Sequence, residues 1–242
     1  MINKRIYLIA IFGILALVSC KKDKEISPEY TSLKINFSYT VDGHPLIFDS
    51  IMYSNDAGEL YAVSRLEYYV SNITFHRPYG DIHKTNKIFY LEATTPSANS
   101  ILLDSIPTGR YSYITFNVGL DANHNVSYSL PNTAENINMA WPAMMGGGYH
   151  FLKLEGHYLI DSSNFGYAMH LGGNASLVSC KINEECIVNY YDPKLGFKMN
   201  INEWFRTPHI YSFNTDGNYS MGDSLLMTKI KSNGFDAFSL QK

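Results

Sequence analysis

The chain has 242 residues and a formal net charge of −3, and only 17% of its residues are charged. A mildly acidic chain without a basic patch is not expected to bind nucleic acid. Its 19 tyrosines and 13 phenylalanines favour β-sheet, where aromatic rings pack on the pleated surface.

The first twenty residues have the pattern of an export signal. Lys4 and Arg5 precede an apolar run over residues 6–18, which is too short for a transmembrane helix of about 20 apolar residues. The run ends in Leu17-Val18-Ser19-Cys20, which resembles the bacterial lipobox that is cleaved before a diacylated cysteine. We therefore predict that residues 1–19 are a signal peptide and that Cys20 is lipidated. An ordinary secretory signal is the alternative.

Residues 20–32 are polar and aperiodic, which is typical of a flexible tether. The folded domain is expected over residues 33–242, and roughly 210 residues are sufficient for one all-β domain. Loss of residues 1–19 leaves 17 basic and 22 acidic groups, so the mature chain has a net charge of −5. Nothing along the chain resembles a second linker.

Short strand patterns follow one another along this domain. Residues 33–39 alternate apolar and polar side chains before a turn at Asp42-Gly43, and residues 65–75 are rich in β-branched and aromatic side chains. Such a spacing indicates a sandwich or a barrel. We predict an all-β fold, a β-sandwich of the immunoglobulin-like or jelly-roll-like kind. Further strands are expected at residues 88–93, 101–103, 111–118, 149–160, 167–171, 177–180 and 187–191.

Three segments depart from the strand pattern. Residues 121–148 are rich in Asn, Pro and Gly, and a loop of this length in a compact domain is usually functional or disordered. Residues 224–234 predict a short helix that ends at Gly234 in the left-handed conformation. A helical turn is also expected at residues 200–205.

Cys180 and Cys186 are the two cysteines besides Cys20. In an oxidising compartment, two cysteines separated by five residues predict a disulfide across a tight β-loop. A metal-binding pair is the alternative, although cysteine metal sites usually have the shorter C-x₂-C spacing.

The eight histidines are candidate metal ligands, because neutral imidazole binds zinc and copper. There is no H-E-x-x-H, G-x-S-x-G or phosphate-binding glycine loop, and we expect a protein that is not an enzyme. Strand alternation puts His150 on the face of Leu152 and Leu154, and His157 on the opposite face. At most one of these two histidines is then expected in a given site.

Trp141 stands in the segment Met139-Ala140-Trp141-Pro142-Ala143-Met144-Met145 within the long loop. Thioether and imidazole ligands together favour Cu(I), which is a soft ion. Alternatively, these methionines fill an irregular part of the core, as methionine often does.

Several motifs follow one another along the chain: Arg65 to Ile73, Gly119-Leu120-Asp121 with Asn123-His124-Asn125, Met139-Ala140-Trp141, Gly148 to Gly156, and His170-Leu171-Gly172-Gly173, with Met221-Gly222-Asp223 and Asn233 to Ser239 in the tail. In this order they resemble the MbnP-like copper-binding family, and the tail motifs resemble its Bacteroidetes-type lipoprotein branch. The resemblance covers most of residues 33–240. The chain differs from the copper-binding members in having Pro142 and a glycine triplet where they carry a second tryptophan.

The resemblance implies a β-rich periplasmic or surface protein that binds copper, often paired with a di-haem enzyme of the MauG type. By motif, Trp141 is the residue expected to be oxidised to kynurenine. His170 is the first candidate ligand and His124 the second, and His150, Met139 or the oxidised Trp141 would complete the site.

Our hypothesis is a lipoprotein of the cell envelope, held at the outer membrane on its periplasmic or outer face, that binds copper as a carrier or scavenger. Because imidazole must be neutral to bind a metal, affinity is expected to fall below about pH 6.5. The alternative is a metal-independent envelope protein that binds a protein partner or a glycan through its aromatic side chains.

Overall fold

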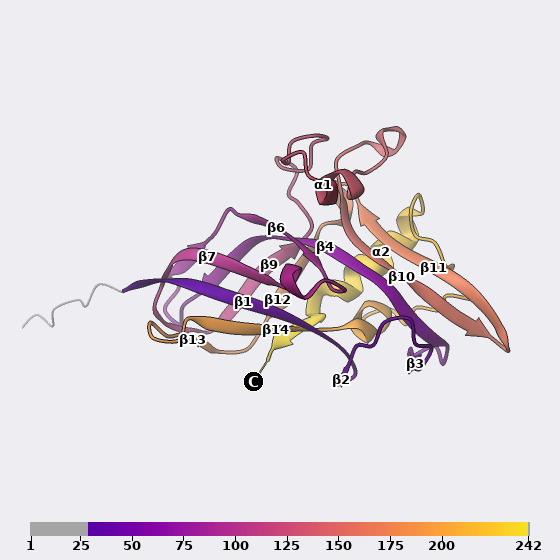
Figure 1. Ribbon diagram of the computed structural model, residues 1–242, viewed down its shortest axis with the longest axis horizontal. Helices are drawn as coiled ribbons and strands as arrows, with labels where there is room; N and C mark the ends of the chain where they lie inside the picture. The colour runs from indigo at the N-terminus through magenta and orange to yellow at the C-terminus, as the bar shows by residue number, and fades with distance from the viewer. Residues whose placement is uncertain (1–28, 242) are drawn as a thin grey trace, which may run out of the picture.

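The computed structural model describes residues 29–241. They fold into two β-sheets that pack as a sandwich, with a small third sheet at one end (Figure 1). The predicted all-β sandwich is therefore confirmed. The expected strands at residues 65–75, 149–160 and 167–171 correspond to three long strands of one sheet, which are β4 (Leu60–His76), β10 (His150–Ile160) and β11 (Ser163–Gly172).

The first sheet is mixed, because β1 runs parallel to β14 and antiparallel to β2 and β7. The parallel register places Phe37 beside Phe197, and both rings point into the core. The members of this sheet are β1 (Tyr30–Val41), β2 (His44–Pro45), β7 (Ser100–Pro107), β14 (Lys194–Asn200) and β15 (Phe238–Leu240).

The second sheet has the order β11-β10-β4-β9-β12, and three short strands also pair with β4. Its members are β3 (Tyr53–Ser54), β4 (Leu60–His76), β5 (Ile82–Lys84), β6 (Ile88–Glu92), β9 (Tyr113–Val118), β10 (His150–Ile160), β11 (Ser163–Gly172) and β12 (Val178–Ile182). The third sheet consists of β8 (Gly109–Tyr111) and β13 (Cys186–Val188).

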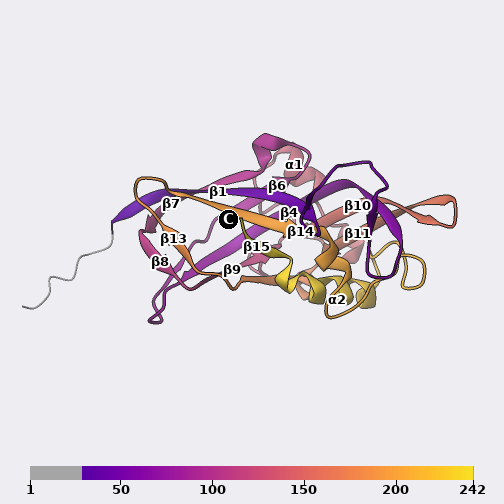
Figure 2. The ribbon, with the colours of Figure 1, turned by 90° about the horizontal axis from the view of Figure 1, so that it is seen from below.

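Helices are short and lie outside the sheets. The α-helices are α1 (Ala134–Asn138), inside the long loop, and α2 (Ser224–Asn233), which lies near β11 (Figure 2). The 3-10 helices are η1 (Pro96–Ala98), η2 (Ala143–Met145), η3 (Asn174–Ser176), η4 (Ile201–Phe205) and η5 (Gly234–Asp236). The two helical segments predicted in the C-terminal part are thus present, as α2 and η4.

Gly234 does not have the predicted left-handed conformation, since its φ is −71° and it continues into η5. Packing explains why a glycine occupies this position. A Cβ at this position would lie 2.3 Å from the Trp204 ring. The indole of Trp204, which is fully buried, therefore needs a residue without a side chain at this point.

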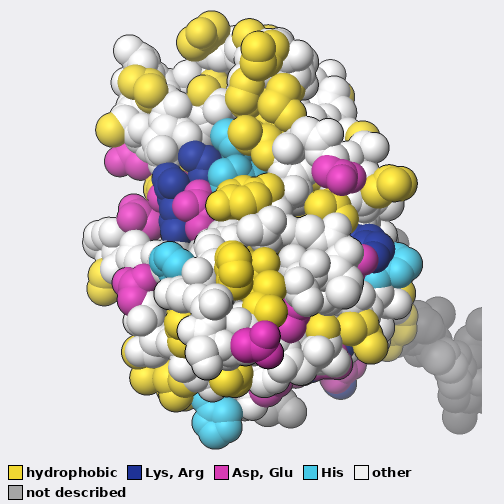
Figure 3. Space-filling view, turned by 90° about the vertical axis from the view of Figure 1, so that its right-hand side faces the viewer, with side chains coloured by type: hydrophobic (Ala, Val, Ile, Leu, Met, Phe, Trp, Pro, Cys, Tyr) yellow, Lys and Arg dark blue, Asp and Glu magenta, His cyan; other side chains and the backbone are white. Residues whose placement is uncertain are grey.

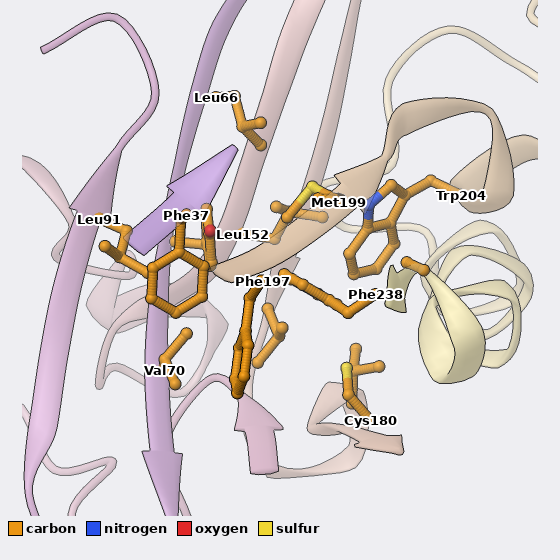
Figure 4. Close-up of a cluster of buried hydrophobic side chains, with 14 of the residues drawn as sticks. Phe37, Leu66, Val70, Leu91, Leu152, Cys180, Phe197, Met199, Trp204 and Phe238 are labelled. Carbon is orange, nitrogen blue, oxygen red and sulfur yellow. Dashed lines mark hydrogen bonds between the residues drawn. The ribbon is translucent and has the colours of Figure 1, made fainter. Parts of the chain in front are cut away.

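Aromatic rings from both sheets fill the core (Figure 4). Phe37 lies 5.5 Å from Phe197 and 6.4 Å from Tyr68, measured between ring centroids. Phe116 lies 5.0 Å from Phe238. Each ring buries a large apolar area, and edge-to-face pairs of this kind add about 0.5–1.5 kcal/mol beyond the area buried. These aromatic contacts hold the two sheets of the sandwich together.

The predicted disulfide is wrong, because Cys180 and Cys186 are both free and buried. Cys180 lies on β12 in the second sheet and Cys186 on β13 in the third, so the segment between them leads to a different sheet instead of closing a β-loop. The Cys180 thiol donates a hydrogen bond to the Gly234 carbonyl at 3.3 Å. Burial raises the pKa of Cys180, and it raises the pKa of Cys186 to about 11. Both thiols are therefore poor nucleophiles.

The predicted signal peptide and the lipidated Cys20 lie outside the described residues. Strand β1 begins at Tyr30, within the segment predicted as a tether. Between residues 29 and 241, no helix is long and apolar enough to cross a membrane.

Candidate metal centre

His150 and His170 lie on neighbouring antiparallel strands, at the first residue of β10 and near the end of β11. Lys153 pairs directly with His170, and a bulge in β10 lies between His150 and Leu152. A bulge inserts one residue and so changes the face on which the preceding side chain lies. For this reason His150 leaves the face of Leu152, where simple alternation had placed it, and its ring contacts His170.

Three aromatic rings meet at this point. The His150 and His170 ring centroids are 5.1 Å apart with planes at 86°. Trp141 lies edge to face against His150, with centroids 4.7 Å apart. Trp141 is 4% and His150 6% exposed, so water has almost no access to the contact between the two rings. The structure thus brings together three of the residues that were predicted for one site.

Trp141 is held by backbone contacts of its own loop. Its N–H donates to the Gly148 carbonyl at 2.9 Å, and its indole N–H donates to the Met145 carbonyl at 3.2 Å. The glycine triplet makes this turn possible, because φ is +101°, +68° and +87° at residues 146–148. On β11, a Cβ at Gly172 would lie 2.2 Å from the indole. The ring therefore fits only against a glycine.

The hydrogen bonds of His150 fix which of its ring nitrogens carries the proton. Nδ1 lies 3.2 Å from the Met139 carbonyl oxygen, which also accepts from the His150 backbone N–H at 2.6 Å. A carbonyl only accepts, so Nδ1 is the donor. In the neutral imidazole the lone pair is then on Nε2.

His170 has the opposite arrangement. Its Nε2 lies 2.9 Å from Oε1 of Glu155, and a carboxylate accepts, so Nε2 carries the proton. Its Nδ1 is buried and has no hydrogen-bond partner. An unpartnered buried ring nitrogen is costly unless something else binds it. Metal-binding histidines typically have this arrangement, with one nitrogen donating to an oxygen and the other free for the metal.

Burial keeps His150 uncharged. It lowers the pKa of His150 to about 4, with smaller contributions from Lys153 and His170. The imidazole is then neutral over the whole physiological range, as ligation requires. At His150, competition from protons is therefore expected near pH 4, which is lower than the sequence-based estimate of about pH 6.5.

A network of charged groups supports Glu155. Arg65 contacts Glu67 at 2.7 Å and Glu155 at 3.2 Å. The hydrogen bond from His170 lowers the pKa of Glu155 against the effect of burial, and Arg65 and Lys153 lower it further. Lys153 is buried and donates to the Asn138 carbonyl at 2.6 Å. Figure 3 shows acidic, basic and histidine side chains gathered on one face.

No sequence motif indicated this network, because its members are dispersed over β4, β10, β11 and α1. One local signal was available, since Thr133 is followed by Ala134 and Glu135. Thr133 caps α1 by accepting from the Asn136 N–H, and an acidic residue in the first turn is typical of a helix start.

His124 does not join the pair. Its ring contacts Asp121 at 2.7 Å, and its side chain is 47% exposed. Asp121 also accepts from the backbone N–H groups of Asn123 and His124, so the carboxylate that closes the turn also binds the ring. Within residues 29–241 there is no group of three or more His, Cys, Asp or Glu that could hold a metal. The structure therefore brings His170 together with His150, whereas the ring of His124 lies against Asp121.

Met139 contributes its carbonyl to the site and its thioether to the core. Its side chain is fully buried among other apolar side chains. This matches the alternative that a methionine of this segment fills the core.

A pocket of about 460 Å³ opens beside Trp141. Its apolar wall includes Tyr128, Leu130, Ile137, Trp141 and Tyr149. A pocket of this size is sufficient for a small organic ligand. Trp141 forms part of its wall, although only 4% of this residue is exposed.

The comparisons with known proteins agree with this architecture. The structure is similar to that of MbnP from Methylosinus trichosporium, with a TM-score of 0.53 and 13% sequence identity, over 88% of this chain and 98% of that chain. At this identity the likeness concerns the fold. No curated protein matches the sequence. The family model MbnP matches residues 30–222, which is most of the chain, and the chain therefore belongs to the MbnP family.

Proposed function

We propose that this protein binds one copper ion through His150 and His170, beside Trp141, while it is held in the cell envelope by a lipid on Cys20. The observation that carries this proposal is the pair of imidazoles in ring contact. Each has one nitrogen hydrogen-bonded to an oxygen, and Nδ1 of His170 is buried without a partner.

The spacing of the rings supports a shared ligand. A metal–nitrogen bond to histidine is about 2.0–2.1 Å, so two imidazoles on one ion have centroids a few ångströms apart. The observed 5.1 Å is within that reach. The low pKa of His150 also supports it, because no proton has to leave this imidazole when the metal binds.

The number of donors favours copper over zinc. Structural zinc is almost always bound by four ligands, whereas no third His, Cys, Asp or Glu joins the pair within residues 29–241. Imidazole binds both metals, and copper is the more strongly bound of the two at a nitrogen site. Copper would supply charge and a redox-active centre, and the protein would act as a carrier or scavenger, not as a catalyst.

Trp141 is the residue whose oxidation the family resemblance implies, and its contact with His150 supports that assignment. A di-haem partner of the MauG type would supply the oxidising equivalents. Conversion to kynurenine would place new polar atoms beside the two histidines. Intact mass of the peptide that contains Trp141, from protein isolated from its own cells, tests this part of the proposal.

The copper site is tested by competition with a chromophoric Cu(I) chelator. Wild type is expected to bind one equivalent, and His150→Ala and His170→Ala are expected to lose it. His124→Ala is the matched control, because His124 belongs to the same set of sequence motifs but points to solvent. Equal binding by all four proteins would exclude the histidine pair as the site.

The second candidate is a metal-independent protein that binds an organic partner, and the pocket beside Trp141 favours it. A protein with this function would keep its partner after copper is removed by chelation. A partner that is lost together with copper would support the copper site.

A further inference from the structure

Exposed aromatic and aliphatic side chains gather at one end of the sandwich. This end is formed by the start of β1, the turn between β4 and β5, the third sheet, and the segment from β13 to β14 (Figures 1 and 2). We call it the tyrosine end. Its exposed members are Tyr30, Tyr79, Ile82, Ile187, Tyr190 and Tyr191.

Backbone contacts show that these segments are neighbours. The Thr108 N–H donates to the Glu29 carbonyl at 2.7 Å, and Arg77 donates to the Thr108 carbonyl at 3.0 Å. Arg110 pairs with Ile187 between β8 and β13, and the Lys34 N–H donates to the Pro193 carbonyl. The four segments therefore form one continuous end of the molecule.

Two tyrosines project from this end almost completely. Tyr79 is 97% exposed at the tip of a tight turn, which the Arg77 N–H closes on the Asp81 carbonyl at 2.8 Å. Tyr191 is 93% exposed, next to Tyr190. Tyrosine is enriched at membrane–water interfaces, where its ring lies among the headgroups and its hydroxyl remains in water.

We infer that the tyrosine end lies against the lipid bilayer surface, and this inference rests on the proposed lipid anchor at Cys20. Only eight residues lie between Cys20 and Glu29, where the described chain begins at this same end. Even a fully extended segment of that length reaches only about 30 Å. The anchor therefore keeps the tyrosine end close to the membrane.

Charges at this end are balanced, so a neutral lipid surface is sufficient. Arg110 forms an ion pair with Glu185, and Lys194 contacts Asp192 at 3.1 Å. A patch that depended on anionic lipid would carry an excess of basic side chains. Contact through tyrosine rings should therefore depend little on salt. Helix α1, beside the histidine pair, lies away from this end, so the proposed copper site would face the surrounding medium (Figure 1).

Hydrogen–deuterium exchange on vesicles tests the inference. The mature chain from residue 20 is coupled through the Cys20 thiol to a maleimide lipid in neutral vesicles of phosphatidylethanolamine and phosphatidylcholine. Cys180 and Cys186 are buried and should not react. The reference is the same chain with Cys20 capped by a water-soluble maleimide. We expect several-fold slower exchange over residues 77–82 and 187–193 in the coupled protein, at low and at raised salt alike, and no change over residues 126–131.

Tyr79→Ser combined with Tyr191→Ser should remove this protection. Tyr128→Ser is the matched control, because Tyr128 is 94% exposed but lies in the long loop. Unchanged exchange over both segments, or protection that the double substitution leaves intact, would overturn the inference. Protection that rises with the protein density on the vesicle would assign this end to a second copy instead. The intact mass of protein from the envelope tests the natural anchor separately, because artificial coupling does not need it.

Discussion

Lowering the pH should destabilise the metal-free protein through His150. The unfolded chain binds a proton at this imidazole near pH 6.5, whereas in the folded protein burial lowers the pKa to about 4. Between these values the unfolded state binds more protons, so the stabilisation is complete above pH 6.5 and is lost as the pH falls through this window. One pKa unit corresponds to about 1.4 kcal/mol, so the full loss is about 3 kcal/mol, and about 2 kcal/mol is lost by pH 5.

Urea denaturation of the metal-free protein at pH 7 and at about pH 5 measures this loss. His150→Gln keeps a polar side chain of similar length but cannot take up a proton, and it should show a smaller loss between the two pH values. The near-ultraviolet circular dichroism of the variant at pH 7 shows whether its tertiary packing is retained. If wild type and His150→Gln lose the same free energy, His150 is not held neutral by burial and the reasoning fails.

Three further predictions follow from the site and the core. Glu155→Ala should weaken Cu(I) binding by about 10–100-fold in the chelator competition, because the carboxylate that orients His170 is lost. Glu185→Ala is the control and should leave the affinity unchanged, because Glu185 is exposed and forms its ion pair with Arg110 at the tyrosine end. Gly172→Ala should displace Trp141, since the new Cβ would lie 2.2 Å from the indole. The variant should then have a lower midpoint of thermal unfolding and a red-shifted tryptophan fluorescence. An unchanged emission spectrum would argue against this tight contact. Cys180 and Cys186 should resist a thiol reagent in the native protein and react as two thiols after denaturation without reductant. If these two thiols react only after a reductant has been added to the denatured protein, the two cysteines form a disulfide and the prediction fails.

The sequence was sufficient to predict where the long strands lie. It was not sufficient to predict the sheet face on which each side chain of a strand lies. β4 and β10 are dense in apolar and β-branched residues, which leaves little doubt about their extended conformation. The side-chain face of His150, however, depends on a bulge of one residue, and a bulge has no composition of its own. An alternation rule applied across it therefore assigned His150 to the wrong face.

The hydrogen-bond partners of the two candidate histidines differ in how well the sequence predicts them. His124 and His170 both stand in recognisable motifs, but Asp121 binds the ring of His124 within its own turn. His170 meets Glu155 across two strands, and this contact depends on the register between β10 and β11. A contact within one turn can be predicted from the spacing of residues along the chain. A contact between two strands can be predicted only when the register of the strand pair is known.

The long loop and the charged network stabilise each other. Helix α1 has only five residues, too few to be stable in isolation, and the carbonyls at its end need donors. Lys153 donates to the carbonyl of Asn138, and His150 donates to that of Met139. These two donors come from β10, so the same contacts that close the helix also hold the His150 ring against Trp141. The contacts from β10 and the long loop therefore position His150 beside Trp141, and the proposed copper ion would bind at this histidine.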